Sequence, residues 1–351
     1  MTSVDPVDLA TEVGPLRLKN PVMAASCEAT MTERDIVACL DAGAGAVVAK
    51  SVNESEAAAR QLNIAEYVLL DGAGDQVDWP DRVGDETLLC RSGLAQSSLD
   101  DWLAMLERAG RHARGLDAHV IGSITVAEPG PAAQIARRMA EVVSAVELNV
   151  GAPHGREAAA VRQLTGPDMV AEYTRVVRAG LDVPLIVKLP AQADSPAELA
   201  HAARRAGADA VAMIGRFNGF WPDVRTGAPL LGSWGAVGSG AMLPTSLYWV
   251  SKTVAADPDL SVVGTNGARS GTDVARFLLS GARAVELATA VMLRGPAVLG
   301  ECVRELAAVL ADAGHRRAAD AIGVALAKAA RYADIPERER PAQPWRVPPR
   351  G

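Results

Sequence analysis

Two short apolar runs, separated by a span of helical pattern, most constrain the fold of this chain. Residues 146–149 read Val-Glu-Leu-Asn, and residues 184–190 read Pro-Leu-Ile-Val-Lys-Leu-Pro. Both runs end abruptly in polar and turn residues, as buried parallel strands do at the edge of a sheet or barrel. The active site of an α/β barrel lies at the carboxyl ends of its strands. Asn149 and Lys188, which stand at these two strand ends, are therefore candidates for chemistry.

The same alternation continues along the chain. Short apolar runs alternate with amphipathic helical spans. The strands are expected at residues 22–25, 46–49, 118–124, 145–150, 184–189, 209–214, 260–265 and 283–288. The helices are expected at residues 33–40, 98–114, 131–143, 167–180, 196–206, 243–256, 271–280 and 296–314. Parallel strands alternating with helices in this number predict an α/β fold of the TIM (β/α)8 barrel type.

Two long segments interrupt this alternation. Residues 52–97 and 215–240 have few periodic apolar positions, and we expect both as insertions at the C-terminal rim of the barrel. The second contains Arg216 among several aromatic residues, so it is either a binding lid or a loop packed against the rim. Residues 7–20 predict a small hairpin at the barrel floor. A tail rich in Pro and Arg follows at 332–351, which leaves residues 1–331 as one barrel domain.

Composition excludes several classes of protein. The net charge is −7 and the basic residues are scattered, which argues against nucleic-acid binding. The four cysteines lie far apart without a CxxC pair, so no metal site is expected. No apolar run approaches the ~18 residues that span a membrane. The beginning of the chain lacks the apolar core of a signal peptide, and a cytoplasmic protein without a membrane partner is the expectation.

The loops after the seventh and eighth strands commonly bind phosphate in such barrels. Here they read Gly-Thr-Asn-Gly at residues 264–267 and Ala-Thr-Ala at residues 288–290. Small residues let backbone N–H groups approach an anion, although two ordinary turns explain the pattern equally well. Lys50 and Lys188 close apolar strands at the same rim, where a lysine cannot easily extend to solvent. Two such lysines indicate an anionic ligand.

Seven short motifs, in order at successive strand ends, carry a resemblance. They are Asn20-Pro21 with Ala24-Ala25-Ser26, Ala49-Lys50-Ser51, Glu147-Leu148-Asn149 with Pro153-His154, Val187-Lys188-Leu189-Pro190, Ser239-Gly240, Thr265-Asn266-Gly267, and Glu286 to Ala290. Over residues 8–315 the chain resembles the dihydroorotate dehydrogenase and dihydropyrimidine dehydrogenase superfamily. The resemblance implies a TIM barrel with FMN at its C-terminal mouth.

The resemblance also implies roles for individual residues. Lys188 would stand near the N1–C2 edge of the flavin, where positive charge stabilises the reduced form. The cofactor contacts would be Ala25, Ser26, Lys50, Ser51, Asn149, Lys188, Gly240, Thr265, Asn266, Gly267, Ala288 and Thr289. The positions that match or adjoin the family's substrate contacts are Cys27, Cys90, Asn149, His154 and Arg216.

The proton-transfer residue departs from the family pattern. Members transfer a hydride at flavin N5 while a cysteine or serine handles the proton on the neighbouring carbon. The matching position is Ala152 in the dihydroorotate branch and Thr165 in the dihydropyrimidine branch, and neither is a good acid. His154 has a suitable pKa range. We therefore take Thr165, His154 and Lys188 as the catalytic candidates, with Cys27, Glu28 and Cys90 as further groups that ordinary packing also explains.

Three functions follow from these observations. The first is an FMN-dependent oxidoreductase that acts on a C–C or C–N bond of a small, polar, cyclic, amide-like molecule other than orotate. The second is an aldolase-like lyase in which Lys188 forms a Schiff base. The third is a barrel that binds FMN without catalysis. The electron donor or acceptor is not identified by the sequence, and a homodimer is expected only by analogy with related proteins.

Overall fold

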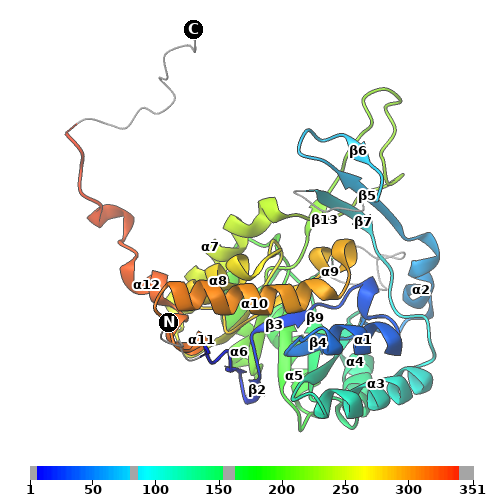
Figure 1. Cartoon of the computed structure of the whole chain (residues 1–351). Helices are drawn as coiled ribbons and strands as arrows, with labels where there is room; N and C mark the ends of the chain where they lie inside the picture. The colour runs from blue at the N-terminus through cyan, green and yellow to red at the C-terminus, as the bar shows by residue number, and fades with distance from the viewer. Residues whose placement is uncertain (1–5, 80–85, 153–162, 340–351) are drawn as a thin grey trace.

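A computed structural model describes residues 6–79, 86–152 and 163–339. Its centre is a closed barrel of parallel strands (Figure 1). In barrel order the strands are β3 (Val22–Ala24), β4 (Ala46–Val48), β8 (His119–Thr125), β9 (Ala145–Asn149), β10 (Leu185–Lys188), β11 (Ala210–Met213), β14 (Ser261–Thr265) and β15 (Ala284–Leu287). The TIM-barrel prediction is confirmed. Asn149 and Lys188 are register partners in neighbouring strands, so both polar side chains reach the same rim.

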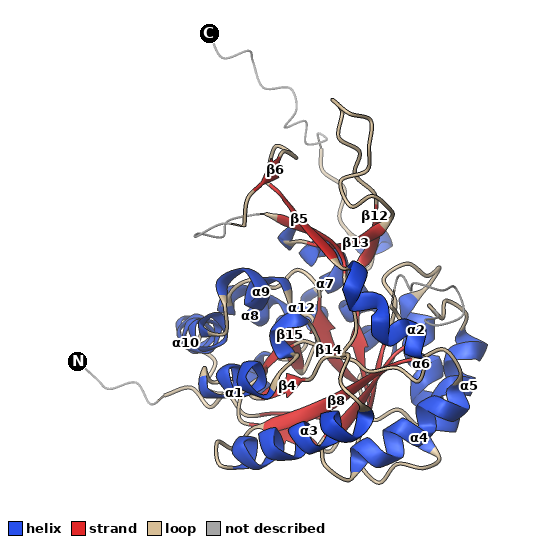
Figure 2. Ribbon diagram, turned by 90° about the vertical axis from the view of Figure 1, so that its right-hand side faces the viewer, coloured by secondary structure: helices blue, strands red, loops and turns tan. Residues whose placement is uncertain are grey.

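Helices surround the barrel (Figure 2). They are α1 (Glu33–Asp41), α3 (Leu99–Arg114), α4 (Pro129–Ala140), α5 (Pro167–Arg178), α6 (Pro196–Arg205), α7 (Leu243–Ala256), α8 (Gly271–Leu279) and α10 (Ala297–Asp312). Local sequence sets their starts. Thr32, Ser98, Ser195 and Ser270 each accept a backbone N–H at a helix N-cap, and proline stands in the first turn of α4, α5 and α6. The expected helix positions agree to within three residues.

A hairpin of β1 (Thr11–Val13) and β2 (Leu16–Leu18) closes the barrel at the end opposite the rim. Gly14 makes the turn with φ +56°, and its N–H donates to Ser261 Oγ at the start of β14. The hairpin's apolar side chains pack in one cluster with the residues that point into the barrel. The expected hairpin at the barrel floor is thus present.

The two insertions form a second sheet. It contains β5 (Glu66–Leu70), β6 (Gln76–Val77), β7 (Thr87–Arg91), β12 (Phe217–Gly219) and β13 (Gly235–Gly238) in the antiparallel order β12-β13-β7-β5-β6. Figure 1 shows this sheet rising from one side of the barrel mouth. Register pairs such as Ala236 with Cys90 join the two insertions. The sequence pattern predicted two separate loops, and the pairing between them is a finding of the structure.

Shorter elements complete the chain. They are α2 (Glu56–Ala59), α9 (Thr289–Arg294), α11 (Ala318–Ala321) and α12 (Val324–Lys328), with 3₁₀ turns η1 (Glu28–Thr30), η2 (Arg60–Ile64), η3 (Gly240–Met242) and η4 (Tyr332–Asp334). Residues 327–339 are exposed. The boundary between residues 331 and 332 stays a prediction, because most of the expected tail lies outside the described residues. Within the described ranges, no helix is both long and apolar enough to cross a membrane.

Candidate active site

A cleft of about 1040 Å³, including space open to solvent, lies at the carboxyl ends of the barrel strands. The expected cofactor contacts line it, except for Lys50 and Ser51: Ala25, Ser26, Asn149, Lys188, Gly240, Thr265, Asn266, Gly267, Ala288 and Thr289. Residues far apart in the sequence thus meet in one site.

One end of the cleft is built to approach an anion closely. Asn266 and Gly267 follow β14 with φ values of +69° and +106°. Two successive residues in the left-handed region, one of them glycine, let the backbone N–H groups come close to a ligand. Gly238 leaves room for the Thr289 hydroxyl, since a Cβ there would lie 2.5 Å from Thr289 Oγ1. Arg269 and Arg294 add positive charge to the same lining. Small residues, a hydroxyl and two guanidinium groups fit a phosphate group.

We expect Gly267→Ala to impair retention of a phosphate-bearing cofactor. Its Cβ would lie 2.6 Å from the backbone of Leu243, and its φ of +106° strains any L side chain. A loop that shifts to relieve this strain moves its backbone N–H groups away from the phosphate, and we expect the affinity to fall on the order of tenfold or more. The measurement is the flavin-to-protein absorbance ratio after dialysis. Gly227→Ala is the matched control, because Gly227 has φ +71° but nothing within 4 Å. Equal flavin loss in both variants would contradict the assignment.

Lys188 lies between two buried carboxylates at the barrel centre. Its Nζ donates to Glu147 Oε2 at 3.4 Å and to Glu286 Oε2. Both glutamate side chains are fully buried, and Glu286 Oε1 has no hydrogen-bond partner among the described residues. Two buried acids therefore share one ammonium group. Such an arrangement favours a proton on the acid pair, because an extra buried negative charge is costly.

Lys188 forms a triad with the buried Glu147 and Glu286. Burial and pairing set the direction in which the pKa values of Lys188 and Glu286 shift. Burial alone would lower the pKa of Lys188, but the two carboxylates raise it well above its usual range. Burial and the Glu147 carboxylate raise the pKa of Glu286 more than Lys188 lowers it. Lys188 accordingly keeps its proton at neutral pH. A protonated amine is not a nucleophile, so the geometry does not favour the Schiff-base hypothesis.

A second, smaller cavity of about 400 Å³, open space included, adjoins the cleft. Ser26, Asn149, Ala152 and Arg216 line both spaces. The remaining lining is mostly polar and comes from the first insertion and the strand ends: Lys50, Ser51, Gln61, Ser92, Gly93, Leu94 and Thr125. The polar lining of this cavity suits a small polar substrate beside a larger cofactor.

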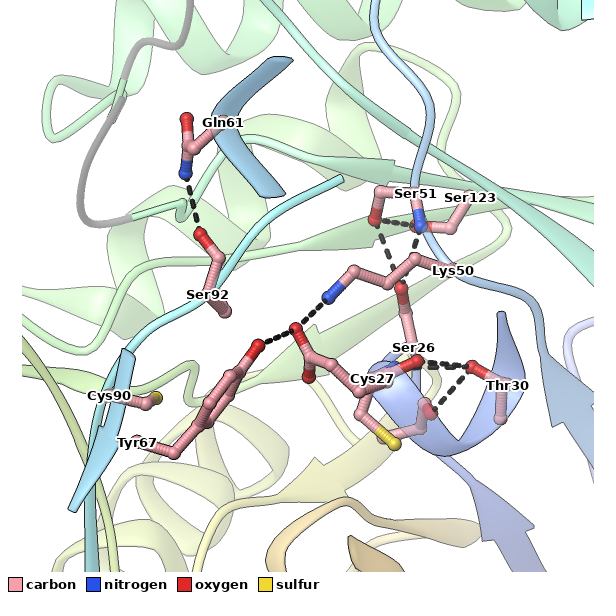
Figure 3. Close-up of polar contacts among 12 residues, drawn as sticks. Ser26, Cys27, Thr30, Lys50, Ser51, Gln61, Tyr67, Cys90, Ser92 and Ser123 are labelled. Carbon is pink, nitrogen blue, oxygen red and sulfur yellow. Dashed lines mark hydrogen bonds and ion pairs between the residues drawn. The ribbon is translucent and has the colours of Figure 1, made fainter. Parts of the chain in front are cut away.

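Lys50 and Tyr67 meet on one carboxylate beside the smaller cavity. Glu28 Oε1 accepts from Lys50 Nζ at 2.7 Å and from Tyr67 Oη at 2.6 Å. Figure 3 shows Lys50 and Tyr67 approaching this acceptor from opposite sides. Burial would raise the pKa of Glu28, but the Lys50 charge and the two hydrogen bonds lower it overall. The cluster joins β4 and η1 of the barrel rim to β5 of the second sheet.

Arg216 belongs to the second insertion and contacts the first. Its guanidinium donates to Cys90 Sγ at 2.8 Å and to Ser92 Oγ at 2.9 Å. The carboxylate of Glu28 also acts on Arg216 through space. Because Arg216 lines both spaces, its charge is available to an anionic or carbonyl-rich ligand.

Three serines form a hydrogen-bonded row beneath the cavity, which we call the serine row: Ser26, Ser51 and Ser123 (Figure 3). Ser26 Oγ and Ser51 Oγ are 3.0 Å apart, and Ser51 Oγ and Ser123 Oγ are 2.8 Å apart. Ser123 Oγ then donates to Glu147 Oε1 at 3.0 Å. The serine row therefore connects the ligand space to the buried acid pair.

The structure does not bring all of the expected catalytic and substrate residues together. Thr165 is exposed just before α5 and is outside both linings. His154 lies outside the described residues. Cys27 is buried and lines neither the cleft nor the smaller cavity. Burial raises the pKa of its thiol to about 11, so Cys27 is a poor proton carrier. Cys90 is buried as a partner of Arg216. The roles of these residues stay predictions.

Several polar groups of the site were missed in the sequence. Glu147 and Glu286 each stand inside an apolar strand, and a charged residue in such a run is a visible signal, since carboxylates are almost never fully buried without partners. Ser123 gave a weaker signal of the same kind within β8. Tyr67, Gln61 and Ser92 gave none, because their positions depend on how the first insertion folds.

Comparison with known proteins agrees with this geometry. Residues 80–310 match the family model described as dihydroorotate dehydrogenase. A relative from Pyrococcus abyssi is 30% identical over 315 residues, which cover 89% of this chain and 97% of the relative. One from Thermoplasma acidophilum is 26% identical and covers 91% and 99% of the two chains. Both are named dihydroorotate dehydrogenase B (NAD(+)), catalytic subunit. This chain belongs to the dihydroorotate dehydrogenase family.

Membership makes the chain a flavin-dependent oxidoreductase with FMN as its cofactor. The residues present fit that group. The phosphate cradle at Asn266 and Gly267 suits the dianionic phosphate, and the protonated Lys188 suits a ring that gains negative charge on reduction. FMN supplies hydride transfer when bound. The chain's own residues then have to bind the substrate, exclude water and move a proton.

Proposed function

We propose that this member of the dihydroorotate dehydrogenase family transfers a hydride between FMN and one carbon of a small, cyclic, amide-like molecule other than orotate. The observation that carries the proposal is the smaller cavity beside the cofactor cleft, with Lys50, Asn149 and Arg216 in its walls. Ammonium, amide and guanidinium donors match the carbonyl oxygens of a cyclic amide. The resemblance to dihydropyrimidine dehydrogenases supports a ring of that type.

Ala152 supports a substrate other than orotate. It lines both the cleft and the smaller cavity, where it offers a methyl group and no proton. The family's dihydroorotate branch has its proton-transfer residue at the matching position. A chain without that acid has to move the proton by another route, and its preferred substrate is expected to differ accordingly.

Anaerobic reduction of the bound flavin tests this function. Purified protein is mixed without oxygen with dihydroorotate, 5,6-dihydrouracil and other saturated cyclic amides in turn, while the flavin absorbance is followed. We expect one of the other saturated cyclic amides to bleach the flavin band faster than dihydroorotate does. Faster bleaching by dihydroorotate would overturn the substrate proposal. A flavin that no panel member reduces, and that dithionite does reduce, would favour a barrel that binds FMN without catalysis.

Electrons are proposed to leave through a partner protein. The relatives are named as catalytic subunits of NAD(+)-linked enzymes, which supports a separate electron-transfer subunit here. A homodimer is likewise proposed by analogy with the family. Co-purification of a flavin- or iron-containing protein from the source cells, and light scattering of the isolated chain, would test the two proposals separately.

A further inference from the structure

The serine row and the acid pair beneath it have the geometry of a proton path. Ser51 N–H donates to Ser26 Oγ at 3.0 Å, and the Ser26 hydroxyl is placed to donate in turn to Ser51 Oγ. Ser123 Oγ donates to Glu147 Oε1, which fixes the other end. All three hydroxyls can therefore point the same way, from Ser26 toward Glu147. This orientation leaves a lone pair of Ser26 Oγ toward the cavity that Ser26 lines.

The buried end of the row can hold a proton. Glu147 and Glu286 are each at most 1% exposed, and both accept from the single ammonium of Lys188. One proton on the two carboxyls leaves one negative charge, which Lys188 balances. That proton can lie on Glu286, whose Oε1 has no hydrogen-bond partner among the described residues, and Glu147 Oε1 is then left to receive a second proton from Ser123 Oγ. A hydroxyl row alone is too weakly acidic for this task, and the acid pair supplies the missing acidity.

We propose that the serine row, together with Glu147 and Glu286, transfers the proton in this enzyme. It replaces the proton-transfer residue that the family's dihydroorotate branch has at the position of Ala152. In substrate oxidation the hydride leaves one carbon with its electron pair. The proton leaves the adjacent carbon, and the electrons of that C–H bond form the new C=C bond. Ser26 Oγ receives this proton and passes its own to Ser51, Ser51 to Ser123, and Ser123 to Glu147 Oε1. Reduction runs the same path in reverse. This role rests on the proposed function.

Ser26 is the catalytic residue in this scheme because it lines the ligand space. Ser51 lines the smaller cavity as well, whereas Ser123 is fully buried and lines neither space. Ser123 is therefore the position at which to interrupt the path without touching substrate or cofactor. Ser123→Ala removes the link, and Ser123→Cys removes it while filling the space that a substitute water would need, because a thiol donates only weakly.

The first test needs no substrate. Infrared spectra of the FMN-loaded protein, taken as the difference from Glu286→Gln, identify the carbonyl band of the protonated acid. On transfer to deuterated buffer, we expect this proton to exchange quickly in the wild type. In Ser123→Ala and Ser123→Cys the row is interrupted, and with FMN filling the cleft that Glu286 lines we expect the exchange to be slower by on the order of tenfold or more. Ser246→Ala, another fully buried serine outside both linings, should exchange like the wild type. Wild-type exchange in Ser123→Cys, or absence of the band, overturns the proposal.

The second test uses whichever panel compound reduces the flavin. We expect both Ser123 variants to slow the anaerobic bleaching by on the order of a hundredfold, the lower end of what a general acid–base group contributes. Their substrate affinity, measured from the concentration dependence, should stay unchanged. If no compound reduces the wild-type flavin while the exchange results hold, the proposed function fails and the proton path stands. If bleaching is unaffected in both variants, the path fails and the function stands.

Discussion

Replacement of Lys188 by methionine is expected to destabilise the protein by about 3–5 kcal/mol near pH 8, because it leaves two buried carboxyls without their cation. The reason lies in the triad at the barrel centre, where Glu147 and Glu286 share the ammonium of Lys188. Chemical denaturation of the FMN-free protein measures the free energy of unfolding without a contribution from the cofactor. Breaking a buried ion pair on one side is among the most costly single changes in a protein.

The loss should depend on pH in a defined direction. Burial and Glu147 raise the pKa of Glu286 in the folded protein above its ordinary value of 4.5, and loss of Lys188 raises it further. A folded state that binds a proton more tightly than the unfolded state becomes less stable as the pH rises above the unfolded pKa. The variant should therefore be closest to the wild type near pH 5 and furthest from it near pH 8. Lys188→Met with Glu286→Gln should recover part of the loss. A destabilisation that does not change with pH would contradict a buried acid pair.

Glu28→Gln is expected to cost about 2–4 kcal/mol at pH 7, somewhat less than a fully buried pair, because the Glu28 side chain is 22% exposed. The change leaves the ammonium of Lys50, whose side chain is 6% exposed, without a negative partner. It also weakens the hydrogen bond that Tyr67 donates from the second sheet. Urea denaturation at pH 7 provides the measurement.

Here the pH dependence runs in the opposite sense. The Lys50 charge holds the pKa of Glu28 below its usual range, so this carboxylate contributes stability above the unfolded pKa, and the contribution is lost as the pH falls through the folded pKa. Wild type and Glu28→Gln should therefore converge in acid. Tyr67→Phe is the matched control, since it removes one hydrogen bond, worth about 1 kcal/mol, and leaves the ion pair in place. A Tyr67→Phe variant as unstable as Glu28→Gln would show that the hydrogen bond, and not the ion pair, dominates.

The barrel could be predicted because its signals are local. Apolar runs such as residues 185–188, helix caps such as Ser98, and polar residues at strand ends all act within a few positions of one another. Together they placed Asn149 and Lys188 at one rim. The cofactor contacts came from the family resemblance of the motifs at these strand ends, and most of them line one cleft. Parallel strands aligned by register bring their ends together, so order along the chain translates into position around the mouth.

The rest of the site depends on contacts between distant segments. Cys90 pairs with Ala236 across a sheet that neither insertion forms alone, and this pairing places Arg216 against Cys90 and Ser92. Short strands with three adjacent buried residues, as in β5 and β7, lack the alternation that identifies a half-buried strand. Thr165 was a catalytic candidate because its position matches the dihydropyrimidine branch. Such a match does not tell whether the side chain faces the cavity, and Thr165 is exposed.

The shared sheet makes the two insertions one unit for engineering and for sequence divergence. Its strands come from residues 66–91 and 217–238, and each half supplies hydrogen bonds and side chains that complete the other. Leu89 and Cys90 pack on opposite faces of this sheet, and a single-residue insertion ahead of them in β7 would move each to the other face and displace both halves of the cavity wall. Transfer of substrate preference from a relative therefore requires exchanging both segments together, because a graft of one alone would be left with unmatched strand edges at the cavity.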